Sequence, residues 1–346
     1  MIPHSVFGKS PDQPSTWWSG ILRHKSKTLG GFAGSKETGH MTTAQYLDSP
    51  IPLHPVLGDV ENVFAHESSA TASRPQATDG WLFWASKLLP IQRRRSMDAL
   101  FAFWRELKDI ADGTEPRSVK RTLLSNWRDE IAHLYASRPQ HNVSKGLSEA
   151  IYRYGLRRSD FLAIIDGMEM DAQRDIRAPS FAELDRYCEF GAVAIGRLSM
   201  RIFGEETSAG ERVAAELGRA LQFTHTLGNL AKDAARHRLY LPRELLHAQG
   251  IFATTPSWVL AQPALSDVCR DLGAIAQRHY AAAEEALAGC PRRKTRPAAV
   301  TFGVYRALLH ELLRRGWRHL DEPVQIASWH ELSLVASSRS GWTLTN

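Results

Sequence analysis

The chain has 346 residues, of which 43% are hydrophobic and 23% charged, and this ordinary balance excludes a fully disordered, collagen-like or coiled-coil protein. Its length allows one large domain or two domains of average size. A formal net charge of +6 favours anionic partners such as diphosphates or an anionic lipid surface, whereas no pattern points to nucleic acid as a partner.

Residues 1–78 differ from the rest of the chain. They are rich in Gly, Pro, Ser, Thr and His and have few periodic apolar positions, as in the strings GKSPDQPS and GGFAGSKETGH. Such a segment buries too little apolar surface to fold, so this leader is predicted to be largely disordered. A leader resembling a transit peptide and an authentic start at Met41 are two further interpretations that the sequence leaves open.

From Trp81 onward, apolar residues recur at three- and four-residue spacing between Pro and Gly breakers, which is the pattern of amphipathic helices. Strand-like alternation is nearly absent and no fixed-period repeat occurs, so the sequence predicts an all-α fold and not a solenoid. A polar C-terminal tail is predicted over residues 333–346. The predicted helices span residues 86–110, 119–135, 147–154, 159–175, 181–203, 210–235, 257–288 and 300–315.

Cysteine usage and hydropathy limit where the protein works. The three cysteines, Cys188, Cys269 and Cys290, form no Cys-x-x-Cys pair, which argues against a disulfide framework or a cysteine-based zinc site. A reducing cytoplasm is therefore the predicted compartment. No run approaches the roughly 20 apolar residues of a membrane span, so any contact with the inner face of a membrane is predicted to be peripheral.

The first candidate site lies at the end of the aromatic-rich helix predicted over residues 86–110. Asp109 and Asp112 are three residues apart and therefore share a helix face. Carboxylates on one face can hold Mg²⁺, a cation that takes oxygen ligands and bridges protein carboxylates to substrate phosphates. The alternative is a solvated face on which Lys108 pairs with Asp112 at the i, i+4 spacing.

The second candidate site lies near the end of the helix predicted over residues 210–235. Asn229 and Asp233 are four residues apart and again share a face. Beyond them, Arg236, Arg238 and Arg243 offer guanidinium groups that suit phosphate oxygens. The alternative for any one of these arginines is a cation that stabilises the negative end of a helix dipole.

Taken together, these segments resemble one protein family, the squalene and phytoene synthases, and most closely its bacterial presqualene diphosphate synthases of hopanoid biosynthesis. The resemblance covers roughly residues 79–326, in the family's order. It rests on the strings LFWASKLLP, FAFWRELKDIAD, YGLRRSDFLAIIDGMEMDAQRDIRAP, ELDRYCEFGAVAIGRLSMRIFG, ARHRLYLPRELL, ALAGCPRRKTRPAAV and VYRALL.

The resemblance implies a single all-α isoprenoid-synthase domain over residues 79–332, with a central cavity walled by helices. In the family, two aspartate-rich motifs bind Mg²⁺, which grips the diphosphate of one farnesyl diphosphate and helps it to leave. The double bond of a second farnesyl diphosphate attacks the resulting cation, and proton loss closes the cyclopropane of presqualene diphosphate. This step needs no NADPH, and sister enzymes of the squalene and hopanoid pathway are the implied partners.

Both motifs depart from the family's pattern. The first motif, D-D-x-x-D, corresponds to residues 108–112 and begins here with Lys108. The second motif, D-x-x-E-D, corresponds to residues 229–233, where Asn229 and Lys232 replace two of the three acids. A lysine in place of an aspartate turns attraction for Mg²⁺ into repulsion, roughly 4 kcal/mol for each pair of unit charges at about 4 Å and an effective dielectric near 20.

Two hypotheses follow. The chain is either an active prenyltransferase of the presqualene diphosphate synthase type, with a weakened Mg²⁺ site, or a degraded paralogue that binds prenyl diphosphate or a partner enzyme without turnover. For the active enzyme, the resemblance assigns Asp109, Asp112 and Asp233 to the metal, Arg105, Lys108, Asn229, Arg236 and Arg238 to the diphosphates, and Tyr187, Tyr240 and Asp233 to the cation or the proton.

Alternatives stay open at single residues. Lys108 and Lys232 can neutralise a diphosphate directly, as point charges in place of lost metal. Tyr187 and Tyr240 can instead be packed core tyrosines with bonded hydroxyl groups. Replacement carboxylates could come from elsewhere, although acids two apart on a helix do not share a face. The candidates for such replacement are Glu106, Glu169, Asp171 and Asp175.

Overall fold

The computed structural model describes residues 85–173 and 176–320, all of which lie in one unit of the chain, Ile51–Asn346. Over these residues the regular elements are helices, and the β pairing is limited to an isolated parallel bridge between Arg177 and Leu239. The predicted all-α class is therefore confirmed for this part of the chain. The predicted leader, residues 1–78, and the predicted tail, residues 333–346, lie outside the described residues.

An aromatic cluster holds the first helices of the described part together. Phe103 contacts Trp127 and Phe161 edge to face, with ring centroids 5.4 and 5.3 Å apart. Rings buried between crossing helices favour this geometry because the positive edge of one ring meets the negative face of the other. The helices around this cluster are α5 (Ile91–Asp112), α6 (Arg117–Tyr135), α7 (Asn142–Tyr154) and α8 (Arg158–Gln173).

A helix with a π-turn in its middle follows. The side chain of Ser180 accepts a hydrogen bond from the backbone of Glu183, and Glu183 bonds back, which forms a capping box that starts the helix. The helix runs as α9 (Phe181–Cys188), the π-helical turn η3 (Glu189–Val193) and α10 (Ala194–Phe203). The prediction of one helix over residues 181–203 is thus confirmed, but a π-turn, a frequent feature of functional sites, interrupts its register.

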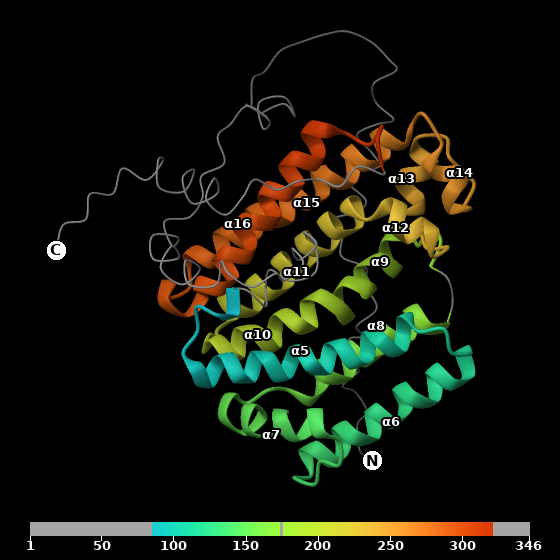
Figure 1. Ribbon diagram of the computed structural model, residues 1–346. Coiled ribbons are helices and arrows are strands. Elements are labelled where there is room, and N and C mark those ends of the chain that lie inside the picture. The colour runs from blue at the N-terminus through green and yellow to red at the C-terminus, as the bar shows by residue number, and fades with distance from the viewer. Residues whose placement is uncertain (1–84, 174–175, 321–346) are drawn as a thin grey trace, which may run out of the picture. The chain divides into compact units, whose positions relative to one another are not determined.

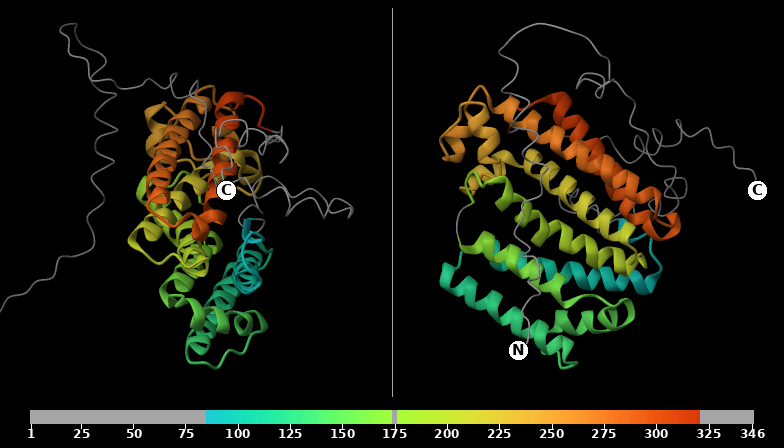
Figure 2. Two further views of the ribbon diagram at one scale, coloured as in Figure 1. Left: turned by 90° about the vertical axis from the view of Figure 1, so that its left-hand side faces the viewer. Right: turned by 180° about the vertical axis from the view of Figure 1, so that it is seen from behind.

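The π-turn lies directly against α11 (Ser208–Gly228). A Cβ atom built on Gly218 would lie only 2.9 Å from the backbone of Val193, so this close approach requires a glycine. On its other side α11 packs against α15 (Leu265–Ala288) and α16 (Arg292–Arg315). Figures 1 and 2 show α11 between α10 and the pair formed by α15 and α16.

Two predicted helices are broken in the structure and two begin several residues earlier than predicted, one of which is α7, which begins at Asn142 and not at residue 147. The helix predicted over residues 210–235 is interrupted at Asn229, after which α12 (Leu230–Ala235) begins. The helix predicted over residues 257–288 is divided into α14 (Pro256–Leu260) and α15. The last helix begins at Arg292, before the predicted residue 300, and carries Pro297 inside it. A short helix, α13 (Arg243–Ala248), was not predicted.

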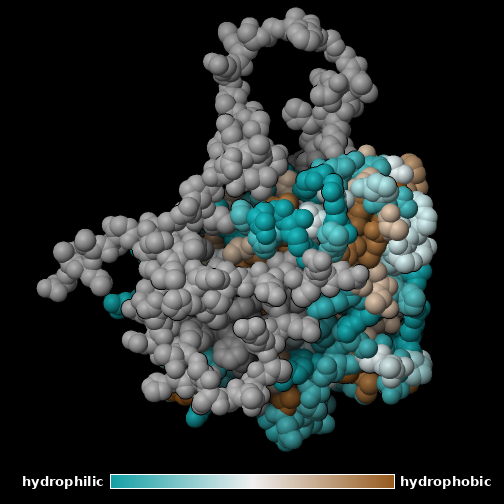
Figure 3. Space-filling view, turned by 45° about the horizontal axis from the view of Figure 1, so that its top comes forward, coloured by the Kyte–Doolittle hydropathy of each residue, from teal (hydrophilic) through white to brown (hydrophobic). Residues whose placement is uncertain are grey.

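One face of the described part can be judged for polarity in a space-filling view. On the face shown in Figure 3, hydrophilic residues predominate and smaller hydrophobic areas lie between them. No helix among the described residues has the length and apolar character needed to cross a membrane.

Candidate active site

A cavity of about 620 Å³ opens between the helices, within the size range of small-molecule sites. Its wall is built from α5, α8, α9, η3, α10, α11, α12, the segment after α12, and α16. Because the first and second candidate sites lie about 120 residues apart in the sequence, the fold is what brings them to one cavity. The predicted central cavity is therefore present.

Much of the wall is apolar or aromatic. The π-turn contributes Gly191, which has no side chain, and Ala192, which has a small one, and both leave room in the cavity. Thr301 and Tyr305 enter from α16. Apolar walls of this kind suit a hydrocarbon chain, because burial of the chain removes its surface from water. The larger apolar side chains of the wall are Phe101, Trp104, Ile164, Met168, Ile195 and Leu221.

The rest of the wall is strongly polar and is formed mainly by the two candidate sites. Lys108 and Asp112 line the cavity from α5, because residues four apart lie on one helix face. The residues opposite come from α11, α12 and the segment that follows. They are His225, Asn229, Lys232, Asp233, Arg236 and Arg238.

Three residues of the two candidate sites are not brought to the cavity. Asp109 and Arg105 are exposed on α5 and do not line the wall. A helix turns by about 100° for each residue, so Asp109 lies roughly 100° from Lys108 and roughly 60° from Asp112 around α5. The packing of α5 directs Lys108 and Asp112 to the cavity and leaves Asp109 exposed. The predicted metal role of Asp109 and the predicted diphosphate role of Arg105 therefore do not fit their positions. Arg243 is also outside the cavity and pairs with Glu183.

Asp112 is the centre of an ion-pair cluster. Arg238 Nη1 donates to Asp112 Oδ1 at 2.8 Å, while Lys108 Nζ and Arg236 Nη1 donate to Asp112 Oδ2 at 3.0 and 3.1 Å. Burial alone would raise the pKa of Asp112, but Lys108 and Arg238 outweigh burial and hold this pKa below its ordinary value. The carboxylate is thus ionised and is shared by three cations.

The break between α11 and α12 positions the second site. Asn229 is buried, and its side-chain amide donates to the carbonyl oxygen of His225 at 2.9 Å, which satisfies one carbonyl at the end of α11. The backbone N–H groups of Arg236 and Arg238 both donate to the carbonyl oxygen of Asp233, at 3.0 and 2.8 Å. The turn that ends α12 therefore brings both arginines back to the cavity.

Asp233 and Asp171 are carboxylates with unusual acidity. Burial raises the pKa of Asp233 to about 7, and the neighbouring carboxylate of Asp171 adds to this shift, while Arg238 opposes it. Burial also raises the pKa of Asp171, against the influence of Arg238 and of two tyrosine hydroxyl groups. Both acids are therefore more readily protonated than an exposed aspartate.

The two predicted tyrosines lie together in the wall. Tyr187 and Tyr240 are stacked with ring centroids 5.2 Å apart, and their hydroxyl groups donate to the two oxygens of Asp171 at 2.9 and 2.7 Å. Burial and the Asp171 charge raise the pKa of both tyrosines, so they stay protonated as donors. The hydroxyl groups point at a carboxylate inside the cavity, which the sequence did not predict.

Asp171 lines the cavity and is a further candidate for the site. It belongs to the GMEMD string of the family resemblance, which is the signal in the sequence that points to it, whereas spacing alone suggests it only as a replacement carboxylate. Among the other candidates for replacement, Glu169 pairs with Arg128 and Glu106 is exposed, and neither lines the cavity. Asp175 lies outside the described residues.

The residues present do not fit the magnesium site that the resemblance implies. Both oxygens of Asp112 are already bonded to cationic side chains. In the described part of the chain, no group of three or more His, Cys, Asp or Glu side chains is placed to hold a metal ion. A divalent cation beside Asp112 would meet the charges of Lys108, Arg236 and Arg238 at close range.

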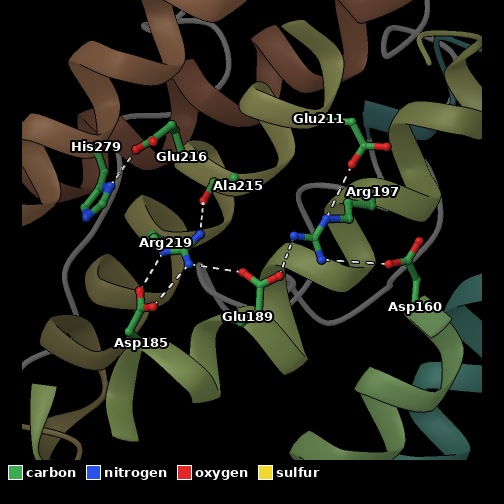
Figure 4. Close-up of polar contacts among 9 residues, drawn as sticks. All are labelled: Asp160, Asp185, Glu189, Arg197, Glu211, Ala215, Glu216, Arg219 and His279. Carbon is green, nitrogen blue, oxygen red and sulfur yellow. Dashed lines mark hydrogen bonds and ion pairs between the residues drawn. The ribbon is translucent and has the colours of Figure 1, made fainter. Parts of the chain in front are cut away.

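A second ion-pair cluster lies outside the cavity and is drawn in Figure 4. Arg219 of α11 bonds Asp185 at 2.7 Å and Glu189 at 3.1 Å. Arg197 of α10 also pairs with Glu189, and it lies 3.5 Å from Glu211 and 3.8 Å from Asp160. None of these residues lines the cavity. Through Glu189, the cluster holds the outer side of the π-turn against α10 and α11. The inner side of the same turn forms part of the cavity wall.

Comparisons with known proteins agree on one family. The sequence profile of squalene/phytoene synthase matches residues 77–330. A presqualene diphosphate synthase from Rhodopseudomonas palustris is 40% identical over 271 residues, which cover 78% of this chain and 97% of the relative. A presqualene diphosphate synthase from Zymomonas mobilis is 37% identical over 283 residues, or 81% and 94% of the two chains.

The fold has a counterpart among solved structures. A squalene synthase from Alicyclobacillus acidocaldarius superposes with a TM-score of 0.63 at 22% sequence identity. The superposition covers 69% of this chain and 89% of the other. At this identity the likeness supports the fold alone.

Proposed function

The chain belongs to the squalene/phytoene synthase family, and from this membership we propose that it is a prenyltransferase that condenses two farnesyl diphosphates to presqualene diphosphate. The observation that carries the proposal is the cavity, which combines a hydrocarbon-compatible wall with cationic side chains in one site. A prenyl diphosphate has this same division into an apolar chain and an anionic head. Residues 79–332 are the proposed catalytic domain.

The chain's own cations have the main role in the proposed reaction. Lys108, Arg236 and Arg238 stabilise the diphosphate as it leaves, because fixed positive charges in a partly buried site favour the negative charge that develops there. The aromatic wall then excludes water from the allylic cation.

The proton lost when the cyclopropane closes needs an acceptor. Asp171 is a carboxylate in the cavity wall whose raised pKa makes it a stronger base than an exposed aspartate. Tyr187 and Tyr240 hold this carboxylate through their hydroxyl groups. In the proposal Asp171 accepts the proton and the tyrosines position Asp171.

A second candidate function is binding of a prenyl diphosphate without turnover. The observation that favours it is the state of Asp112, which is shared by three cations and does not present a metal-binding carboxylate. In the family the metal also orients the leaving group, and a lysine cannot replace that role. A chain of this kind would serve as a carrier of prenyl diphosphate or as a partner of a sister enzyme.

A product assay separates the two candidates. The purified chain is incubated with labelled farnesyl diphosphate and Mg²⁺, with and without NADPH, and the lipid product is identified. The first proposal predicts presqualene diphosphate without a need for NADPH, because the condensation includes no reduction. A folded chain that binds farnesyl diphosphate but forms no product would support the second candidate and contradict the first.

The remaining expectations about partners and location stay predictions. They are sister enzymes of the squalene and hopanoid pathway, a cytoplasmic location and peripheral contact with a membrane surface.

A further inference from the structure

We propose that Lys108, Arg236 and Arg238 form a diphosphate clamp that works without a divalent metal, and that Asp112 is the internal anion that holds these three cations in place. The inference rests on the proposed binding of a prenyl diphosphate and deepens that function. It gives Asp112 a role opposite to the metal-ligand role that the family resemblance assigns.

The geometry of the three cations supports the clamp. Their nitrogen atoms come from two parts of the chain that are 124 residues or more apart, yet all three lie within 3.1 Å of the two oxygens of a single carboxylate. Nitrogen atoms gathered around one small anion are also arranged to bond a diphosphate, which offers more oxygens and more negative charge than a carboxylate. Guanidinium groups in particular match phosphate oxygens.

The three side chains differ in their freedom to move. The side chain of Arg238 is only 12% exposed, and its backbone N–H is fixed to the carbonyl oxygen of Asp233. The side chains of Lys108 and Arg236 are 39% and 61% exposed. Arg238 is therefore the fixed base of the clamp, and the other two can turn from Asp112 toward a ligand that enters from solvent.

The charge of the cavity also favours an anion. Four cationic residues, Lys108, Lys232, Arg236 and Arg238, share the wall with three carboxylates, Asp112, Asp171 and Asp233. Among the described residues of the wall, the cations remain in excess even when every carboxylate is ionised. A positively charged site attracts a diphosphate without a metal ion between them.

The two roles of Asp112 predict opposite effects of removing its charge. If Asp112 binds metal, Asp112→Asn weakens the binding of a prenyl diphosphate. If Asp112 instead competes with the ligand for the three cations, the same change strengthens the binding, because the ligand no longer displaces an internal anion. The asparagine keeps one carbonyl oxygen, so it still accepts a hydrogen bond from the clamp.

Calorimetric titration of the full chain tests the clamp. The probes are farnesyl thiodiphosphate, an analogue that ionises very slowly, and inorganic diphosphate, each titrated in EDTA and in Mg²⁺. The clamp predicts that both probes bind in EDTA and that Mg²⁺ tightens neither by more than about twofold. Binding of the farnesyl probe that requires Mg²⁺ would overturn the clamp and leave the proposed function standing.

The two probes also separate the clamp from the proposed function. Inorganic diphosphate that binds in EDTA, with no binding of the farnesyl probe under either condition, would support the clamp and contradict the prenyl substrate. Absence of binding by both probes would overturn both inferences.

Variants then test the role of Asp112. We expect Asp112→Asn to bind farnesyl thiodiphosphate about tenfold more tightly in EDTA, because one nearby negative charge is removed. The matched control is Asp98→Asn, an exposed aspartate on the same helix that does not line the cavity, and its affinity should match the wild type. Weaker binding by Asp112→Asn would contradict the proposal.

A second variant keeps the test decisive if Asp112→Asn does not fold. Lys108→Ala removes one arm of the clamp and should weaken binding in EDTA by about tenfold. The control is Lys145→Ala, an exposed lysine of α7. Unchanged affinity of Lys108→Ala would exclude Lys108 from the clamp and overturn the proposal.

Discussion

The two ion-pair clusters of the molecule differ in how their charges are balanced. In the outer cluster, two arginines are shared among four carboxylates, so each guanidinium has an acidic partner on more than one side (Figure 4). In the cavity, one carboxylate is shared among three cations. We expect the cluster that satisfies its cations internally to serve the fold, and we propose that the cluster with cations in excess binds an anion from outside.

The two clusters also differ in which elements of the fold they join. The outer cluster joins α9, the π-turn, α10 and α11, and Glu189 lies in the π-turn itself. The cavity cluster joins α5 to the segment after α12 through the ion pairs of Asp112. Variants can therefore separate the two clusters, since one should change stability and the other should change affinity.

The largest expected effect comes from reversing the charge of the cavity. The triple variant Lys108→Asp, Asn229→Asp and Lys232→Glu changes the formal charge by two, one and two units at these positions. We expect its affinity for farnesyl thiodiphosphate in EDTA to fall by about a thousandfold, and Mg²⁺ to restore at least tenfold of this loss. Titration in EDTA and in Mg²⁺ measures the two affinities. An unchanged affinity in EDTA would show that the cations of the cavity do not bind the diphosphate, which contradicts the difference drawn between the two clusters.

The next effect is on stability and belongs to the outer cluster. Arg219→Ala leaves Asp185 and Glu189 without their shared guanidinium and should lower the free energy of unfolding by about 2 kcal/mol. The affinity for farnesyl thiodiphosphate should change by less than about twofold. Arg212→Ala is the matched control on the same helix, because its pair with Glu285 is exposed and should cost less than about 0.5 kcal/mol. Urea unfolding and titration of the same samples would show whether the two effects are separable.

The corresponding change in the cavity is similar in size and affects binding. Arg238→Ala removes the fixed base of the clamp and should weaken the binding of farnesyl thiodiphosphate about 30-fold. This change corresponds to about 2 kcal/mol, near the value of one charge-assisted hydrogen bond. Arg243→Ala, in the same segment but paired with Glu183 outside the cavity, is the control and should keep its affinity. Equal losses in both variants would indicate a general disturbance of the segment and not a clamp.

The pH dependence of stability also distinguishes the two clusters. The pKa of Asp233 is raised, so its contribution to stability is fully present below about pH 4 and is lost as the pH rises through about 7. The pKa of Glu216, beside the outer cluster, is lowered by its hydrogen bond with His279, so its contribution is present above about pH 4.5 and is lost as the pH falls.

Unfolding measured at pH 5 and pH 8 tests this difference. Asp233→Asn should gain roughly 2.5 kcal/mol relative to the wild type between pH 5 and pH 8, because the variant has no charge to bury and each pH unit below the folded pKa is worth about 1.4 kcal/mol. Glu216→Gln should lose stability at both of these pH values and approach the wild type below about pH 4. A wild-type advantage over Asp233→Asn that grows toward pH 8 would show that the Asp233 carboxylate is stabilised by the cations and not disfavoured by burial.

The sequence predicted the all-helical class because apolar periodicity is a local property of each helix. It could not predict the break at Asn229, where a buried amide bonds back to His225 and replaces a helical hydrogen bond. The early start of α16 was missed because Pro297 argued for a later helix, yet the structure accepts the loss of one backbone donor there. The π-turn of η3 has no signature in hydrophobic spacing.

The site was predicted in part for a similar reason. Spacing on α5 allowed either Asp109 with Asp112 or Lys108 with Asp112 to share a face, and the choice between them depends on how α5 packs against α8. The pairing of Asp112 with Arg236 and Arg238 is a contact across the fold and has no local pattern. The same holds for Asp171 between its two tyrosines, although the string around it was part of the family resemblance.

The most direct test of the account is a crystal structure of the wild-type chain grown with farnesyl thiodiphosphate and an excess of Mg²⁺. The account predicts diphosphate oxygens within hydrogen-bond distance of Lys108, Arg236 and Arg238, with no metal ion between the diphosphate and Asp112. A magnesium ion that bridges Asp112 or Asp233 to the diphosphate would contradict it and would restore these residues to the metal-ligand role.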